Sequence, residues 1–244
     1  MKNLTIIKAA DYETLSIKAA EIIAAQIGAK PDAVLGLATG ATPVGTYKEL
    51  VAKHKAGSLD FSAVSAFNLD EYYPIKRTND QSYCYYMQDN LFGHVNINPA
   101  NVHIPDGEAA DAPAECAKYE AKVAAARLDL QLLGIGKNGH IGFNEPADHF
   151  PKTTNHVALT QSTIDANSYF FENAADMPRH ALTMGIGTIF AAKRILLLVS
   201  GGAKADIIKQ AFFGPITPQL PASILQLHSD VTLIVDSDAG KNLV

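Results

Sequence analysis

The chain has 244 residues, of which 48% are hydrophobic and 18% charged, a composition typical of a globular domain with a sizeable buried core. Its formal net charge of −5 gives no general attraction to nucleic acid or to anionic membranes, and no run of lysine or arginine occurs. Any anion site must therefore be local.

The sequence has no long apolar window and no secretory signal, so we expect neither a membrane span nor export. Cys84 and Cys116 lie far apart and have no metal-ligand spacing, which favours reduced thiols. We therefore expect a cytoplasmic protein with no nucleic-acid or membrane partner.

Six apolar runs recur along the chain: "LTII", "AVLGLA", "VSAFNL", "LDLQLLGIG", "RILLLVS" and "VTLIVD". Their continuous apolarity is typical of strands buried on both faces of a parallel sheet. Helices are predicted between them from the Asp11 cap to Gly28, from Thr42-Pro43 onward, and over residues 81–92, 113–127, 203–213 and 221–228. The pattern predicts one Rossmann-like α/β domain over residues 1–244, with a mostly parallel sheet flanked by helices.

One segment, residues 146–190, interrupts this alternation with weak strand signals and a mixed polar pattern. An insertion of this kind is typical of a lid. We expect it to form an excursion over the carboxyl ends of the strands.

The first candidate for chemistry is "LGLATGATPVGTY", in which a small-residue turn joins a buried strand to a helix. Thr39, Gly40, Ala41 and Thr42 let a ligand approach the backbone, and a helix N-terminus favours an anion such as phosphate. The spacing is neither the Walker pattern nor G-x-G-x-x-G, so a nucleotide is not indicated. A turn that needs small residues only for packing is the alternative.

The second candidate is the adjacent carboxylate pair Asp70 and Glu71 in "FNLDEYYPI", directly after a predicted strand. We expect the two to differ in environment, one held ready to exchange a proton and the other solvated. The alternative is that the pair only starts a helix or turn.

The third candidate is the glycine-rich stretch "LGIGKNGHIGFNEP", residues 133–146. His140 and Glu145 can meet if this loop folds back. A carboxylate on one imidazole nitrogen fixes the tautomer and leaves the other nitrogen to move protons. The spacing is not H-E-x-x-H and no third ligand follows, so we expect no metal. A histidine with a purely structural role is the alternative.

The fourth candidate is Lys204 in "LLLVSGGAKADII", placed in the first turn of a predicted helix. A lysine there opposes the helix dipole, which makes more sense if an anion is bound. A solvated lysine is the alternative.

Together these stretches resemble the glucosamine-6-phosphate deaminase family, within a wider group that includes 6-phosphogluconolactonases. The similarity covers nearly the whole chain and extends to "SYCYYMQDNLF", "ALTMGIGTI" and "PASILQLHSDVTLIVD". The pair "FNLDEY" and "GHIGFNEP" is specific to the deaminases.

The resemblance implies conversion of glucosamine 6-phosphate and water to fructose 6-phosphate and ammonia, with no cofactor. It implies that Asp70 is the base and that His140 and Glu145 assist ring opening. The implied phosphate ligands are Gly40, Ala41, Thr42 and Lys204.

Two positions depart from the family pattern. Asn138 stands where some members carry an aspartate in the ring-opening relay, so it is expected only to position the other groups. Tyr169 stands where many members offer the phosphate an arginine, and a phenol cannot make that bidentate charged contact. We therefore expect the protein either to bind the substrate phosphate more weakly or to act on a different substrate.

Large oligomeric members of the family respond to an allosteric amino-sugar phosphate through basic residues after "FNEP" and an extended C-terminus. This chain has "ADHFPKTTNHVAL" there and stops at Val244, so we expect a short, non-allosteric, monomeric type.

Three other functions stay open: deamination of galactosamine 6-phosphate, lactone hydrolysis, and sugar-phosphate binding by a regulator without turnover. Lactone hydrolysis needs no base aimed at C2, so Asp70 disfavours it. Tyr169 is the feature that favours a regulator.

Overall fold

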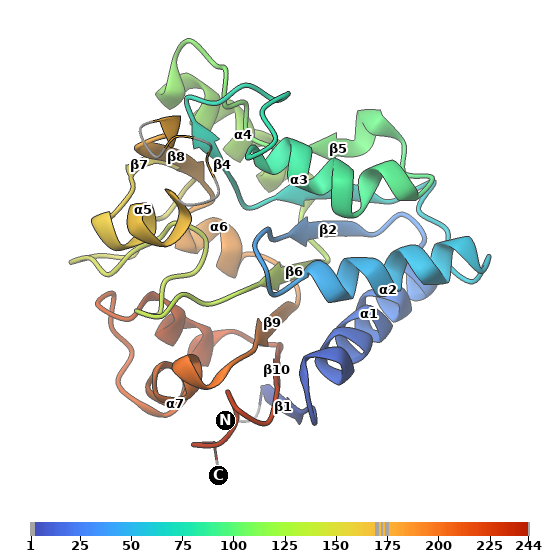
Figure 1. Cartoon of the computed structure of the whole chain (residues 1–244), viewed down its shortest axis with the longest axis vertical. Coiled ribbons are helices and arrows are strands. Elements are labelled where there is room, and N and C mark those ends of the chain that lie inside the picture. The colour runs from blue at the N-terminus through green and yellow to red at the C-terminus, as the bar shows by residue number, and fades with distance from the viewer. Residues whose placement is uncertain (1–2, 169–170, 172, 174–175, 244) are drawn as a thin grey trace.

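A seven-stranded parallel sheet runs through the computed structural model, which describes residues 3–168, 171, 173 and 176–243 (Figure 1). In spatial order its strands are β1 (Leu4–Lys8), β10 (Val231–Val235), β9 (Ile195–Val199), β6 (Leu130–Leu133), β2 (Val34–Leu37), β3 (Ser65–Asn68) and β5 (Val102–His103). The predicted class, a mostly parallel sheet flanked by helices, is confirmed.

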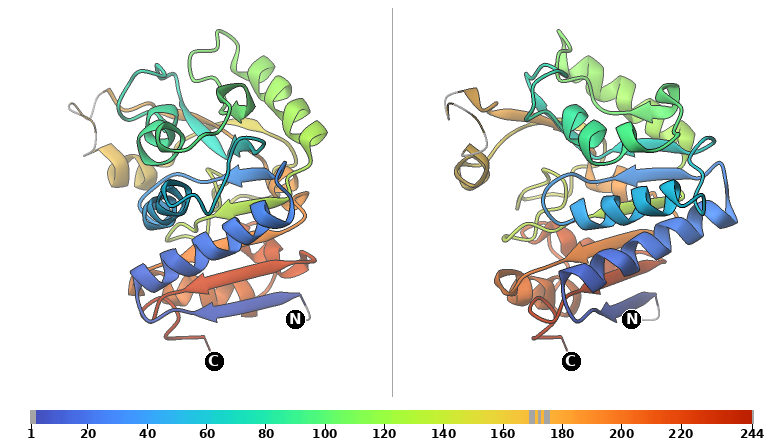
Figure 2. Two further views of the ribbon diagram at one scale, coloured as in Figure 1. Left: turned by 90° about the vertical axis from the view of Figure 1, so that its right-hand side faces the viewer. Right: turned by 45° about the vertical axis from the view of Figure 1, so that its right-hand side comes forward.

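Helices cover both faces of this sheet. One face carries α1 (Tyr12–Ala29), α2 (Val44–Lys55) and α3 (Tyr83–Asn90), and Figure 2 shows α1 and α2 side by side across it. The other face carries α6 (Ile186–Phe190) and α7 (Ala205–Phe213), while α4 (Ala112–Ala126) packs against α6. Short 3-10 helices lie between these elements: η1 (Phe92–His94), η2 (Pro99–Asn101), η5 (Gly202–Lys204) and η6 (Pro221–Leu227).

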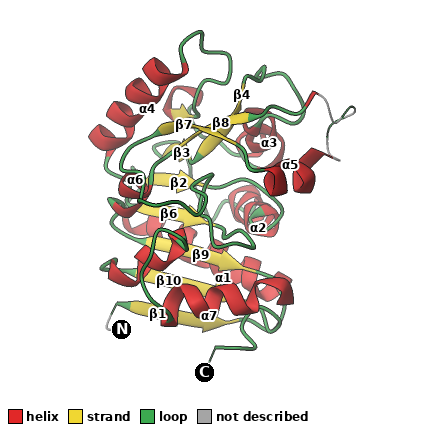
Figure 3. Ribbon diagram, turned by 90° about the vertical axis from the view of Figure 1, so that its left-hand side faces the viewer, coloured by secondary structure: helices red, strands yellow, loops and turns green. Residues whose placement is uncertain are grey.

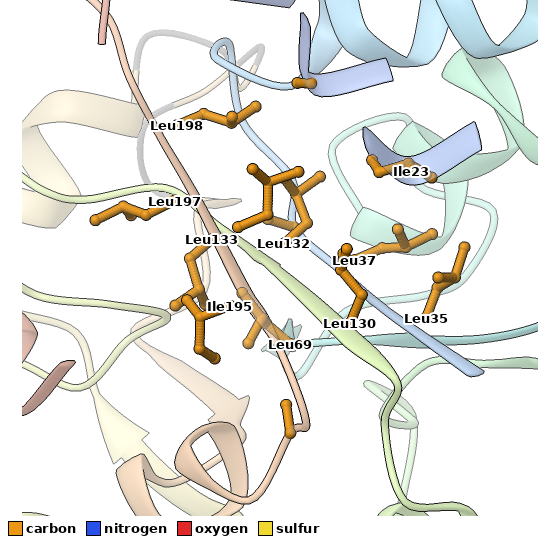
Figure 4. Close-up of a cluster of buried hydrophobic side chains, with 14 of the residues drawn as sticks. Ile23, Leu35, Leu37, Leu69, Leu130, Leu132, Leu133, Ile195, Leu197 and Leu198 are labelled. Atoms are coloured by element: carbon orange, nitrogen blue, oxygen red, sulfur yellow. The ribbon is translucent and has the colours of Figure 1, made fainter. Parts of the chain in front are cut away.

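The core combines leucine and isoleucine side chains of the central strands with helix side chains such as Ile23 (Figure 4). Leu132 and Leu197 are fully buried, and Leu37, Leu130 and Ile195 are at most 1% exposed. Neighbouring positions along one strand, whose side chains point to opposite faces, are both buried. This arrangement explains why the sequence shows continuous apolar runs.

Side-chain caps fix where several helices begin. The Asp11 carboxylate accepts the Thr14 N–H at 2.7 Å, as predicted, and Ser82 caps α3 in the same way. The predicted Thr42 cap of α2 is wrong. Pro43, with helical φ and ψ, occupies the cap position and makes no side-chain bond there, because proline has no polar side-chain atom.

A second, antiparallel sheet of three strands lies beyond β3 and β5, at the upper end of the molecule in Figure 3. Its strand order is β4 (Asp70–Tyr73), β8 (His180–Thr183) and β7 (Asn155–Ala158). Tyr72, Phe143 and Ile164 belong to its separate apolar cluster. Segment 146–190 thus contributes β7, β8 and the short helix α5 (Gln161–Asn167), where the sequence indicated weak strands, and ends with α6 on the parallel sheet.

Among the described residues, no helix is both long enough and apolar enough to cross a lipid bilayer.

Candidate active site

The candidate site lies where the strand order of the parallel sheet reverses. From β2 the chain moves outward to β3 and β5, then returns to β6 on the other side of β2 and continues to β9 and β10. Open α/β sheets bind ligands at such a switch point, outside the carboxyl ends of the strands. Lys204, His140 and Thr42 lie in the segments that follow β9, β6 and β2, and Asp70 begins β4 just after β3.

The turn after β2 is held in place by tyrosines from three helices. Tyr12, Tyr47 and Tyr86 donate hydroxyl hydrogen bonds to backbone carbonyls of residues 38–42 at 2.5–3.1 Å. The N–H groups of residues 40–42 find no acceptor among the described residues. A turn of free N–H groups before a helix is typical of an anion site. The sequence indicated the turn but gave no signal for the tyrosines.

Lys204 ends the 3-10 turn after β9 and directly precedes α7. Burial lowers the pKa of its ammonium group, Asp236 opposes this shift, and Lys137 on the loop after β6 lowers the pKa further. No carboxylate of the described residues lies within ion-pair distance of Lys204. A half-buried cation without a counter-ion favours an anionic ligand. Lys137 was not predicted as part of this site.

Asp70 begins β4 and pairs with Thr183 of β8. Its side chain is buried, and burial together with the neighbouring Glu71 raises its pKa to about 8, although the Thr183 hydroxyl opposes the shift. A carboxyl group that titrates near neutral pH is suited to accept and return a proton.

Glu71 is buried rather than solvated, so the expectation that it faces solvent is wrong. Its carboxylate accepts the backbone N–H groups of Tyr72, Tyr83 and Cys84 at 2.8–2.9 Å. Burial raises the pKa of Glu71 to about 7, against the effect of these bonds. The two carboxylates do differ in environment, because Glu71 anchors the start of α3 whereas Asp70 keeps its oxygens away from such backbone donors.

His140 and Glu145 meet as predicted, with His140 Nδ1 3.2 Å from Glu145 Oε1. The other carboxylate oxygen accepts a hydrogen bond from Asn138 Nδ2 at 2.6 Å. Burial alone would raise the pKa of Glu145, but His140, Asn138 and Thr163 together hold it at about 2. A carboxylate that stays ionised can orient and charge-stabilise the imidazole.

Two glycines make this loop compatible with the site. A Cβ at residue 136 would lie 2.3 Å from His140 Nε2, so only glycine leaves room for the ring against the backbone. Gly142 has a φ of +58°, and a Cβ there would come within 2.9 Å of Thr183 Oγ1 and 3.4 Å of Asp70 Oδ2. The glycine-rich loop therefore carries His140 and also passes directly beside Asp70.

Thr160 and Thr163, at the start of α5, also reach this site. Both donate hydroxyl hydrogen bonds to Glu145 Oε1, at 3.3 and 2.9 Å. Sequence reasoning missed them because the pattern "TQST" indicates only a helix start. Only the fold brings this helix start to Glu145, which lies fifteen or more residues earlier in the chain.

Tyr169, singled out by its departure from the family pattern, lies outside the described residues. Among the residues that are described, no three histidine, cysteine, aspartate or glutamate side chains are grouped so that they could hold a metal ion.

The comparisons with known proteins agree with this geometry. The family model described as glucosamine-6-phosphate isomerases/6-phosphogluconolactonase matches residues 8–234. The chain belongs to this family. Its sequence is 55% identical over 234 residues to a glucosamine-6-phosphate deaminase of Clostridioides difficile, which covers 96% of this chain and 94% of that protein. The resemblance to the family is confirmed.

Two further relatives point the same way. A glucosamine-6-phosphate deaminase of Lachnoclostridium phytofermentans is 54% identical over 95% of this chain and 98% of its own length. A solved structure described as a monomeric glucosamine-6-phosphate deaminase superposes with a TM-score of 0.94 at 46% identity, over 98% of this chain and 99% of that one.

Proposed function

We propose that this protein converts glucosamine 6-phosphate and water into fructose 6-phosphate and ammonia. The observation that carries the proposal is one loop that holds the His140–Glu145 pair and has no room for a side chain at Gly142, beside Thr183 and the buried Asp70. Relatives named for this activity, at more than 50% identity over nearly the whole chain, support it.

Substrate binding begins with the phosphate. The free N–H groups of Gly40, Ala41 and Thr42, the hydroxyl of Thr39 and the ammonium of Lys204 form its binding site, and Lys137 adds positive charge. This remote contact supplies binding energy that holds the reacting carbons in place.

Ring opening comes next. His140, oriented by Glu145, relays a proton between the ring oxygen and the C1 hydroxyl and so releases the open-chain aldehyde. Asn138 positions Glu145 through its 2.6 Å hydrogen bond and transfers no proton.

Asp70 then removes the proton from C2 while the C1 oxygen is protonated, which gives an enolamine. Asp70 returns its proton to C1, and the double bond moves to form an iminium between C2 and nitrogen. Water adds to C2, and ammonia leaves as the C2 carbonyl forms. Protons shift, one water molecule adds and ammonia leaves, with no net oxidation or reduction, so we expect no cofactor.

We further propose that residues 146–190 act as a lid within the single domain 1–244. Support comes from α5, which reaches from this segment to the site through Thr160 and Thr163. We also propose a monomer, which the likeness to a solved deaminase described as monomeric supports, and a cytoplasmic location, which the free thiols of Cys84 and Cys116 fit.

The test is to incubate the purified protein, without added metal or cofactor, with glucosamine 6-phosphate and separately with galactosamine 6-phosphate. Matched release of ammonia and ketose phosphate from the glucosamine compound is the expected result. Turnover of only the galactosamine compound would show that galactosamine 6-phosphate, and not glucosamine 6-phosphate, is the substrate. Binding without release from either would favour a regulator, and hydrolysis of a sugar-phosphate lactone would favour a lactonase.

A further inference from the structure

Glu145 is held by hydroxyl groups that do not belong to its own loop. Thr163 Oγ1 donates to Glu145 Oε1 at 2.9 Å, and Thr160 Oγ1 approaches the same oxygen at 3.3 Å. Thr163 is 8% exposed, and the Glu145 side chain is 15% exposed. A hydroxyl–carboxylate contact shielded from water in this way is a strong, directional hydrogen bond.

The oxygen that Thr163 contacts is the one that faces the imidazole. Glu145 Oε1 lies 3.2 Å from His140 Nδ1, while Oε2 is occupied by the Asn138 amide at 2.6 Å. A carboxylate oxygen accepts hydrogen bonds along two lone-pair directions. At Oε1 the Thr163 and Thr160 hydroxyls take these two directions, so the carboxylate cannot rotate without losing a bond. His140 Nδ1 lies beside Oε1 at ion-pair distance and makes no hydrogen bond with a described residue.

We propose that Thr163, supported by Thr160, is a positioning residue that orients Glu145 toward His140, so that ring opening requires α5 in its docked place. This inference rests on the proposed function of the His140–Glu145 pair. Thr163 acts through Glu145, and the effect of its loss therefore appears in the step that His140 carries out.

Apolar packing places α5 against the same loop. Ile164, next to Thr163, shares a buried cluster with Phe143, which lies two residues before Glu145. The Thr160 hydroxyl also accepts the Thr163 N–H and so caps α5. Displacement of α5 would thus remove both hydroxyl donors from Glu145 at once.

The substitution Thr163→Val tests the proposal, because it keeps the side-chain shape and removes the hydroxyl. Thr154→Val is the matched control. Thr154 lies in the same segment, is 5% exposed, and donates its hydroxyl to Glu120 at 2.7 Å, away from the site. Thr163→Ser keeps the donor and should restore the wild-type behaviour.

We expect Thr163→Val to lower kcat about tenfold with little change in KM. A poorly oriented His140 slows ring opening but does not change how the substrate binds. Thr154→Val and Thr163→Ser should keep kcat near the wild-type value. The isotope effect on kcat with substrate deuterated at C2 should fall to unity in Thr163→Val, since slow ring opening hides the later C–H cleavage. An unchanged kcat, or a lowered kcat with an isotope effect still above unity, would overturn the proposal.

A second measurement does not depend on turnover. The Nδ1 proton of His140, observed by NMR at neutral pH, should shift or broaden in Thr163→Val and stay unchanged in Thr154→Val. If the wild-type protein releases no ammonia, the proposed function has failed and this resonance alone decides the positioning role. An identical resonance in both variants would refute that role.

Discussion

We expect the ionisation of Asp70, the proposed base, to link catalysis to pH. Burial and the neighbouring Glu71 raise its pKa to about 8, and proton abstraction requires the carboxylate form. We therefore expect kcat/KM to fall as the pH is lowered through about 8, with a slope that reports one proton. A kcat/KM profile of the wild-type enzyme from about pH 5 to pH 10 measures this limb. A midpoint near the ordinary aspartate value would contradict the assignment.

The same residue makes a prediction about stability. Because the folded-state pKa of Asp70 lies above its unfolded value of 3.8, the native state binds this proton more tightly. Below pH 3.8 the Asp70 carboxyl is protonated in both states and does not lower the free energy of unfolding. As the pH rises from 3.8 to about 8, the unfolded state ionises more readily than the native state, so the free energy of unfolding falls.

Asp70→Asn removes this ionisation and keeps a polar side chain beside Thr183. We expect the variant to lose turnover, to keep binding sugar phosphate, and to melt at least about 3 °C above the wild type at alkaline pH. The difference in Tm should shrink as the pH is lowered. Thermal melts of both proteins across the pH range check this, and an equal or lower Tm at high pH would count against the burial of the charge.

At the scale of elements, three helices hold the turn after β2, which we propose binds the phosphate. The Tyr86 hydroxyl of α3 donates to the Gly40 carbonyl at 2.7 Å and so fixes the orientation of that peptide. We expect Tyr86→Phe to raise KM about three- to tenfold, the cost of one hydrogen bond, with a smaller effect on kcat.

Tyr85→Phe is the matched control for this substitution, because Tyr85 is adjacent, 45% exposed, and its hydroxyl has no hydrogen-bond partner among the described residues. Steady-state kinetics on both variants decide the matter. Equal KM values in the two would show that the turn keeps its shape without Tyr86.

Local signals account for most of what the sequence predicted at this scale. Continuous apolar runs indicated the parallel strands, and the predicted Asp11 cap gave the start of α1. The sequence did not predict the small sheet, because its strand order depends on pairings such as Asp70 with Thr183, more than a hundred positions apart. The contacts of Tyr86 and Thr163 were missed for the same reason, since neither sits in a motif that indicates its partner.

At the scale of the molecule, the two sheets differ in how they are stabilised. The parallel sheet shares one large apolar core, whereas the small sheet and α5 rest on a separate, much smaller cluster around Tyr72 and Phe143. Burial of apolar surface is the main source of stability, so the smaller cluster should open at a lower free energy. A lid must come from such a part of a protein, because it opens while the rest stays folded.

Hydrogen exchange tests this arrangement. We expect the amides of α5 to exchange well before those of β9 and β10 in the free protein, and to slow when a non-reacting open-chain amino-alditol 6-phosphate fills the site. The Thr163→Val variant should speed exchange in α5 and leave β9 unchanged, because its lost bond joins α5 to Glu145 and not to the main core. If α5 proved as protected as β9 without ligand, the lid proposal would fail, since the helix would then open only when the whole domain unfolds.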